Sequence, residues 1–545
     1  MRFAERQNKQ DVSIGHGPET EGGLSAMAWY ESAVFYHVYP LGLSGAPEKN
    51  DYGQPVHRLN DLLPWIDHIR ALGCTGLYIG PLFESSSHGY DTTDYRNLDS
   101  RLGDNADLKR FVASCHEAGI RVILDAVFNH TGRDFFAFRD LRARREGSPY
   151  RDWYCRVNFG GNNEYNDGFS YDNWGGYNLL AKLNLRNPQV VDYHLESVRF
   201  WVKEFDIDGL RLDTADVLDF DFMRRLRETA AEVKPEFWLM GEVIHGEYGR
   251  WANDHTLHAV TNYHLHKALF SGHNDHNYFE IAHTVKRQMD LGIGARLYNF
   301  VDNHDVERIR TKLLNPAHFL PVHVLLYTLP GVPSLYYGSE FGIEGRKERG
   351  SDASLRPCLD LSSLLSQPNP CLDVIRALGR VHAQESALWY GDYRELQLTT
   401  TQYAFARGDL IVTVNNGDRP AFFDVPGDGA YAGALSGREA HAEGGRLRLE
   451  LPPCGGDIWI PQREGRQAYE PIPAAVQPPV QPSAPAAEPR RASSSKPYED
   501  MTVEELQAEI LAKMASNGPV TDRMRRDVMD NVYLNSLLNW VRSFR

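Results

Sequence analysis

The sequence lacks the features that mark several classes of protein. It has six cysteines in 545 residues, none in a CxxC pair, which argues against a metal cluster or a disulfide scaffold. No apolar run is long enough to span a bilayer. The N-terminal segment MRFAERQNKQDVSIGHG has no apolar core of the kind found in secretory signals. These absences predict a protein of the reducing cytoplasm.

Positive charge is also in deficit. The chain has 58 Lys and Arg against 73 Asp and Glu, a formal net charge of -15. This balance argues against nucleic acid or an anionic membrane as a partner, and it is compatible with a neutral substrate. The length allows several domains and a large core.

Short apolar runs alternate with longer amphipathic segments from Trp29 onward. The intervening segments, such as 107–119 and 190–205, have helical spacing. Strand alternating with helix eight times predicts a (β/α)₈ TIM barrel, which we place at residues 28–384. The eight candidate strand runs lie at 34–40, 76–83, 121–130, 209–216, 237–245, 259–265, 295–305 and 333–340.

Two further domains are predicted around this barrel. The connection after the third strand is too long for a simple crossover and is rich in Gly, Asn, Tyr and Trp, so we predict an inserted subdomain at 131–185. Beyond Ala383, alternating apolar residues and turn signals predict a C-terminal antiparallel β domain at 385–462.

The two ends of the chain have a different composition. Residues 1–27 are polar and predict a flexible tail, and residues 463–498 are a Pro/Ala-rich linker. Residues 499–545 predict a helical extension, in which Thr502 and Glu505 can form a capping box. Three uses of this extension stay open: it docks on the barrel, pairs with another chain to form an oligomer, or binds a partner.

Carboxylates end three of the predicted strands: Asp213 the fourth, Glu242 the fifth and Asp305 the seventh. Their spacing is 242 − 213 = 29 and 305 − 242 = 63 residues, about one and two β/α units. Active sites of such barrels lie at the C-terminal ends of the strands. We therefore expect the three acids to converge, although any one alone is better explained as a solvated loop residue.

The stretch DGLRLDTAD (208–216) places charges inside a predicted strand. Leu210 and Leu212 share one face, so Arg211 and Asp213 share the other. Arg211 can hydrogen-bond Asp213 and keep it ionised. Converging acids suit retaining glycoside hydrolysis, which needs an ionised nucleophile and a protonated acid about 5 Å apart.

The chain resembles the α-amylase family, glycoside hydrolase family 13, from about Trp29 to Pro461. The fifth of its matching stretches, in particular, is similar to cyclomaltodextrinases, neopullulanases and maltogenic-type enzymes, although a Pro common there is Ala181 here. Those enzymes usually carry an N-terminal β domain, whereas in this sequence the short segment 1–27 precedes the predicted barrel. The motifs that carry the resemblance are DAVFNH (125–130), GLRLDTAD (209–216), GEVIH (241–245), FVDNHD (300–305), HGYDTTDY (88–95) and LAKLN (180–184).

The resemblance implies roles for individual residues. Asp213 would be the nucleophile, Glu242 the general acid/base, and Asp305 the residue that binds sugar hydroxyls and stabilises the distorted transition state. Other matching positions would bind or support the same sugar: Arg211 orients Asp213, His130 and His304 donate or accept hydrogen bonds, Tyr90 stacks beneath the ring, and Asp125 and Arg308 support the site.

Asn129 stands at a position that ligates calcium in relatives. The Lys-His pair that many α-amylases carry soon after the nucleophile is replaced here by Ala215 and Asp216. Two interpretations of Asn129 stay open, a calcium ligand or a residue that only holds its loop, and we favour the second. No cofactor is expected to be required.

The resemblance implies a retaining hydrolase of α-1,4-glucosidic bonds in maltodextrins or cyclodextrins, which works through a covalent glycosyl-Asp intermediate. Its partner would be an α-glucan oligosaccharide, not nucleic acid or a membrane. An α-glucan transglycosylase shares the first half-reaction and is the alternative. A catalytically silent amylase-fold binding or scaffold protein is disfavoured because all three acids are present. The histidine cluster at 264–276 fits no metal pattern and is predicted to be a loop.

Overall fold

The computed structural model describes residues 28–463, 468–473, 502–517 and 528. The chain divides into two compact units, residues 1–479 and 480–545, and each is described by itself. The predicted tail 1–27, most of the predicted linker and nearly all of the segment 520–544 lie outside the described residues.

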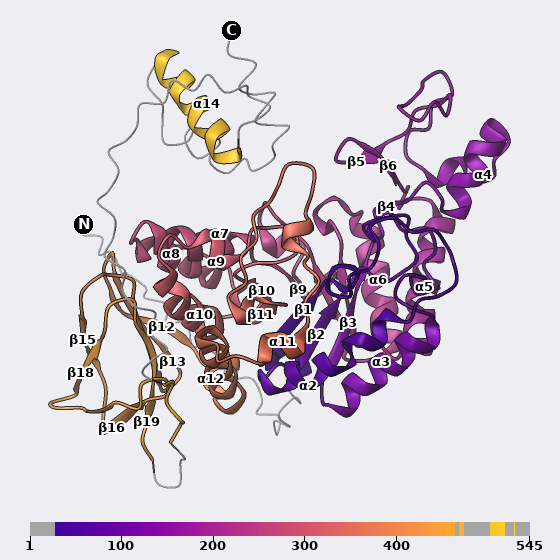
Figure 1. Cartoon of the computed structure of the whole chain (residues 1–545). Helices are drawn as coiled ribbons and strands as arrows, with labels where there is room; N and C mark the ends of the chain where they lie inside the picture. The colour runs from indigo at the N-terminus through magenta and orange to yellow at the C-terminus, as the bar shows by residue number, and fades with distance from the viewer. Residues whose placement is uncertain (1–27, 464–467, 474–501, 518–527, 529–545) are drawn as a thin grey trace, which may run out of the picture. The chain divides into compact units, whose positions relative to one another are not determined.

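Eight parallel strands close into a barrel (Figure 1). Each predicted run overlaps one of them, so the (β/α)₈ barrel is confirmed. In order around the barrel the strands are β1 (Phe35–Val38), β2 (Gly76–Ile79), β3 (Arg121–Ala126), β7 (Gly209–Leu212), β8 (Trp238–Gly241), β9 (Ala259–Thr261), β10 (Leu297–Phe300) and β11 (Val332–Tyr336).

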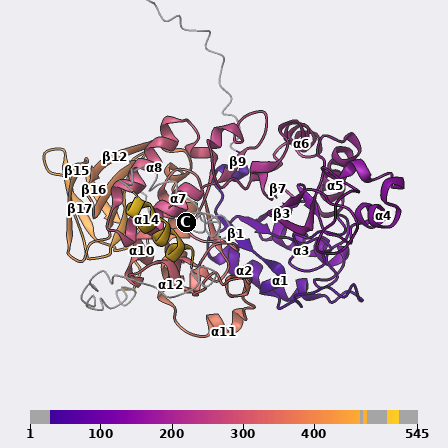
Figure 2. The same ribbon diagram turned by 90° about the horizontal axis from the view of Figure 1, so that it is seen from above.

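Helices surround these strands, as the view from above shows (Figure 2). The longer ones are α2 (Leu63–Ala71), α3 (Asn105–Glu117), α5 (Pro188–Phe205), α6 (Phe220–Val233), α7 (Tyr263–Asn274), α8 (Tyr278–Asp290), α10 (Phe319–Thr328) and α12 (Pro370–Gln384). The short ones are α1 (Pro40–Leu43), α9 (Ile309–Lys312), α11 (Leu361–Leu365) and α13 (Ala387–Tyr390).

The prediction of a loop at 264–276 is wrong, because α7 covers most of it. Asn262 caps this helix by accepting a hydrogen bond from the backbone N–H of Leu265. His266 and His273 are buried on its core side, and burial lowers the pKa of each to about 3. These histidines are therefore neutral core residues. When histidine is counted as polar, the segment loses its helical apolar periodicity, and the helix is not predicted.

Side chains along each barrel strand point alternately outward and inward, and so belong to two separate packing layers. Leu210 and Leu212 on β7 face outward and pack with the helices. The inward face forms a second core, in which Phe35, Trp238 and Tyr298 pack together. Apolar and aromatic side chains thus fill the barrel interior below the point where the charged residues of β7 emerge.

The connection after β3 folds into a small subdomain, shown in purple in Figure 1. It contains α4 (Phe136–Arg144) and a three-stranded antiparallel sheet in the order β4-β6-β5. The strands are β4 (His130–Thr131), β5 (Asn173–Trp174) and β6 (Tyr177–Lys182). Because β4 begins at His130, this subdomain starts directly at the C-terminal rim of the barrel.

The residues after the barrel form two antiparallel sheets, one of six strands and one of two, as predicted. Helix α10 lies between barrel and β domain, which explains why it is buried all round. The buried Arg407 joins the two by donating to the Thr328 carbonyl at 2.6 Å. The strands are β12 (Tyr393–Leu398), β13 (Gln402–Arg407), β14 (Leu410–Asn415), β15 (Ala421–Pro426), β16 (Ala430–Gly433), β17 (Glu439–His441), β18 (Arg446–Leu451) and β19 (Gly456–Pro461).

The second unit contains α14 (Val503–Asn517). The predicted capping box is confirmed: the Glu505 carboxylate accepts from the backbone N–H of Thr502, and the Thr502 hydroxyl accepts from the backbone N–H of Glu505. No helix in the described part of the chain is long and apolar enough to cross a membrane.

Candidate active site

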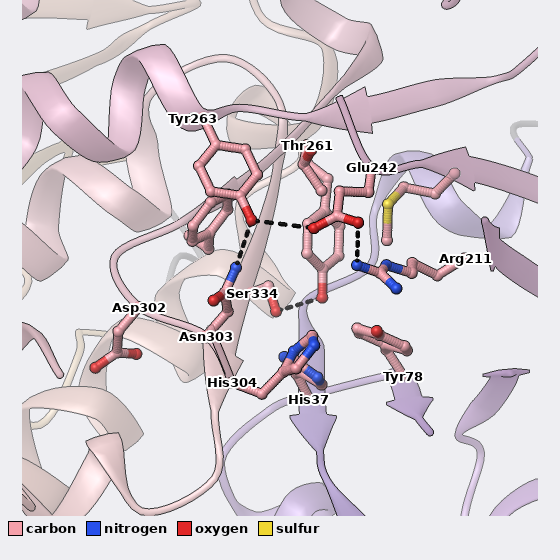
Figure 3. Close-up of a pocket in the computed structure, with 13 residues that line it drawn as sticks. His37, Tyr78, Arg211, Glu242, Thr261, Tyr263, Asp302, Asn303, His304 and Ser334 are labelled. Atoms are coloured by element: carbon pink, nitrogen blue, oxygen red, sulfur yellow. Dashed lines mark hydrogen bonds and ion pairs between the residues drawn. The ribbon is translucent and has the colours of Figure 1, made fainter. Parts of the chain in front are cut away.

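Arg211 on β7 and Asp213, the residue directly after this strand, point into the barrel at its C-terminal mouth. The guanidinium of Arg211 contacts three carboxylates: Asp125 at 2.8 Å, Asp213 at 3.0 Å and Glu242 at 2.7 Å. Asp125 lies on β3 directly beside Arg211, and Glu242 follows the neighbouring strand β8. Figure 3 shows the contact between Arg211 and Glu242. All four side chains are nearly fully buried.

The backbone turns sharply between the nucleophile candidate and the next helix. Thr214 has φ +45° and ψ +46°, a left-handed conformation that is costly for a β-branched residue. In this conformation its backbone N–H donates to Glu242 Oε2 at 2.9 Å, and its hydroxyl lies 3.4 Å from Asp213 Oδ2. The strained turn therefore fixes both carboxyls from one residue.

Asp305 is joined to the same cluster through aromatic and histidine side chains. His304 Nε2 lies 3.0 Å from Asp305 Oδ2 and 2.5 Å from the hydroxyl of Tyr90. Tyr90 in turn donates to Asp125 at 2.8 Å, and its ring stacks on His304 with 12° between the planes. Arg356 donates to the other oxygen of Asp305 at 2.8 Å. The structure thus connects Asp305 through His304 and Tyr90 to the carboxylates around Arg211.

His130 lies on the opposite edge of this group. Its Nε2 pairs with the backbone carbonyl of Tyr90 at 3.1 Å, and its Nδ1 pairs with the amide of Asn129. Burial lowers the pKa of His130 to about 3, with a smaller contribution from His88. His130 is therefore neutral at physiological pH and able both to donate and to accept a hydrogen bond.

The pKa values of the two aspartates of the site are shifted in opposite directions. Burial raises the pKa of Asp213 well above its usual range, and the charges of Glu242 and Asp125 add to this against the guanidinium of Arg211. For Asp305, burial acts in the same direction, but His304, Arg356 and Lys347 outweigh it and hold its pKa well below the usual range. Three carboxyls on one guanidinium favour retention of a proton by the group as a unit.

Arg308 does not belong to the cluster. It is fully buried and donates to the carbonyls of Tyr337 and Leu355 and to the hydroxyl of Ser339. That hydroxyl also contacts Asp302. Arg308 therefore holds the loop after β11 in place behind the site and contacts none of the three acids directly in the described residues.

Asn129 provides a weak basis for a calcium site. Its side-chain oxygen is buried without a hydrogen-bond partner in the described residues, but calcium takes six to eight oxygen ligands. Within the described ranges, the one grouping of three close acidic or histidine ligands is His57, Asp104 and Asp107, where the two acids cap α3. Whether Asn129 binds calcium or only holds its loop therefore stays a prediction, because amide and backbone oxygens can also ligate calcium.

Four residues of the site were not predicted from the sequence. Tyr263 follows β9 and lies 3.3 Å from Glu242 Oε1 (Figure 3); as an aromatic residue at the end of a predicted strand, it could have been suspected. Tyr78 donates to Asp125 from inside β2, where an aromatic residue is more simply predicted to be part of the core. Arg356 and Thr214 could not have been suspected, because a long loop and a single dihedral angle place them.

Comparison with known proteins agrees with this geometry. Residues 58–392 match the family model described as alpha amylase, catalytic domain. The chain is 31% identical over 421 residues to a cyclomaltodextrinase of Bacillus sp, covering 71% of this chain and 73% of that one. It is 30% identical to neopullulanase 2 of Thermoactinomyces vulgaris, covering 79% and 78%. A solved cyclomaltodextrinase superposes with a TM-score of 0.71 at 26% identity, covering 79% of both chains. The chain therefore belongs to the α-amylase family of glycoside hydrolases.

Proposed function

We propose that the protein is a retaining hydrolase of α-1,4-glucosidic bonds in maltodextrins or cyclodextrins. The observation that carries this proposal is the single guanidinium of Arg211, which holds Asp213 and Glu242 at one barrel mouth. Two carboxyls bound to one guanidinium are close neighbours, as the short separation of a retaining pair requires. The names of the relatives support an α-glucan as the substrate.

The contacts of each carboxyl assign its reacting oxygen. Oδ1 of Asp213 is held by Arg211 at 3.0 Å, whereas Oδ2 has only the 3.4 Å contact with Thr214. Oδ2 is therefore the oxygen that attacks the anomeric carbon. The glycosidic C–O bond breaks as the Asp213–sugar ester forms, and the leaving oxygen takes a proton.

That proton comes from Glu242. Its Oε2 accepts from Arg211 and from the backbone N–H of Thr214, so both contacts favour a lone pair there. Its Oε1 has the longer 3.3 Å contact with Tyr263 and is the oxygen that carries the proton. After the leaving group departs, Glu242 takes a proton from a water molecule. The oxygen of that water bonds to the anomeric carbon as the ester bond to Asp213 breaks, and both carboxyls return to their starting state.

The remaining predicted residues would act on the glucose unit that reacts. Asp305, held ionised by His304 and Arg356, would accept hydrogen bonds from ring hydroxyls. Tyr90, flat against His304, would present its ring to the sugar. Both interactions strengthen as the ring flattens and positive charge develops at the anomeric carbon.

The test is the Asp213→Asn variant, assayed with maltotriose, longer maltodextrins and cyclodextrins. The substitution nearly preserves shape but removes the nucleophile, so turnover should fall by at least about 10³-fold while the circular dichroism spectrum stays unchanged. Mass spectrometry of wild type quenched with a slow fluorinated maltosyl substrate should show an adduct on the peptide of Asp213. Normal turnover by the variant would refute the assignment.

The products distinguish hydrolysis from transfer. If water intercepts the ester, maltotriose yields only shorter sugars; if a sugar does, products longer than maltotriose appear. If longer products predominate, the proposed reaction becomes transglycosylation instead of hydrolysis, and the role of Asp213 as nucleophile is unchanged. Failure of purified wild type to turn over any of these sugars would favour a silent binding protein instead.

A further inference from the structure

The subdomain after β3 ends in a tight hairpin that displays two aromatic residues. Gly175 and Gly176 form the two-residue turn between β5 and β6, with φ of +62° and +87°, a conformation that glycine adopts without steric cost. Trp174 and Tyr177 pair directly across this turn. Directly paired residues project from the same face of an antiparallel ladder, so the two rings lie side by side.

These rings are exposed to an unusual degree for their size. Tyr177 is 56% exposed, and Trp174 is only partly buried. A large aromatic surface left open to water at the rim of a site marks a binding surface more often than a folding requirement. The hairpin is also rigid, because Asn173 donates to Asn178 and accepts from the backbone N–H of Gly176.

The hairpin lies next to the candidate active site. The ring of Trp174 is 6.1 Å from that of His130, centre to centre, and His130 contacts the backbone of Tyr90. The strand register supports this placement, because β4 pairs through His130 with Lys182 on the same strand that carries Tyr177. Successive contacts thus connect Tyr177 and Trp174, through His130, to the backbone of Tyr90 beside the acids.

We propose that Trp174 and Tyr177 form a stacking platform for a glucose unit beyond the one that reacts, so that this hairpin sets the preference for chain length. The proposal rests on the proposed function, since it takes the ligand to be an α-glucan. The C–H-rich face of a pyranose ring packs on a flat aromatic side chain, much as the bases of single-stranded nucleic acids stack on aromatic side chains of the proteins that bind them. A preformed platform loses little conformational entropy when the sugar binds.

The test measures binding in the Asp213→Asn background, so that it does not depend on turnover. Isothermal titration with maltotriose and maltoheptaose should show tighter binding of the longer sugar. Trp174→Ala should weaken maltoheptaose binding by about tenfold and leave maltotriose binding nearly unchanged. Tyr177→Ala should give a smaller loss of the same kind, and Tyr177→Phe should retain affinity because it keeps the ring.

The matched control is Phe422→Ala, which removes a 68% exposed aromatic residue on β15 of the C-terminal β domain and should change neither affinity. Equal losses for both sugars in Trp174→Ala would mean that Trp174 only supports His130, and unchanged binding of maltoheptaose would also overturn the proposal. Turnover by the wild type is read separately. A protein that binds with this length dependence but cleaves nothing would refute the proposed function while supporting the platform.

Discussion

Arg211→Leu tests whether one guanidinium neutralises the whole cluster. Arg211 is 3% exposed and contacts three carboxylates at 2.7–3.0 Å. Leucine leaves these carboxyls buried with no countercharge at that point, and the folded variant relieves the repulsion by binding an additional proton. Protonating a carboxyl with an ordinary pKa of about 4 costs about 4 kcal/mol of folding free energy at pH 7 and about 1.4 kcal/mol at pH 5.

The sign of the pH dependence follows from proton binding. A carboxyl whose pKa is higher in the folded than in the unfolded protein stabilises the fold at low pH, and that stability is lost as the pH rises toward the folded pKa. Arg211→Leu raises the folded pKa further, so its destabilisation should grow from pH 5 to pH 7. Denaturant titration monitored by tryptophan fluorescence at both pH values measures the difference.

Arg407→Leu is the matched control. Arg407 is also buried, but its guanidinium donates to the backbone carbonyls of Thr328, Leu388 and Gly391. Its loss should destabilise the protein by a similar amount that does not change between pH 5 and pH 7. An equal penalty for Arg211→Leu at the two pH values would refute the reasoning that its guanidinium offsets ionised carboxyls.

Three further predictions concern catalysis. Glu242→Gln should lower kcat/KM about 10²–10⁴-fold on maltodextrins but far less on α-maltosyl fluoride, because fluoride leaves without a proton. Steady-state kinetics on both substrates measures this, and equal losses would contradict the acid role. Burial, with a smaller contribution from Glu242, raises the pKa of Asp216 to about 6. Its negative charge above that pH interacts with Glu242, so Asp216→Asn should remove the step that this ionisation adds to the pH profile of kcat/KM near pH 6, and an unchanged profile would exclude the coupling. If Asn129 only holds its loop, as we favour, dialysis against EDTA should leave activity and thermal midpoint unchanged, and restoration of lost activity by calcium would overturn this expectation.

Local pattern was sufficient to predict much of the barrel. The alternation of Leu210 and Leu212 with charged residues required one buried face and one polar face, and the structure has both. The inserted subdomain could be predicted because a connection of more than 50 residues cannot be a simple crossover. Each of these features depends on residues that are near one another in the chain.

The features that could not be predicted depend on distant residues or on single backbone angles. Arg356 reaches Asp305 from a loop about 50 residues later in the chain, and no periodicity specifies where such a loop closes. The left-handed conformation of Thr214 opposes the preference of a β-branched residue, so local propensity predicts the opposite. His266 and His273 conceal helix α7 because their burial as neutral rings depends on the completed core.

Strand β8 illustrates why the chemistry lies at one end of the barrel. Trp238 and Met240 point inward and pack in the interior core, and Glu242 follows at the same two-residue spacing. The first two positions gain stability by excluding water, and the third is a carboxyl that needs the countercharge of Arg211 to be tolerated there. Near the N-terminal end of β8, where Phe35 stacks on Trp238, a buried acid would meet no cation and would take up a proton. Asp213 and Glu242 can share charge and proton between them, as the reaction requires, only where the neighbouring strand β7 supplies Arg211.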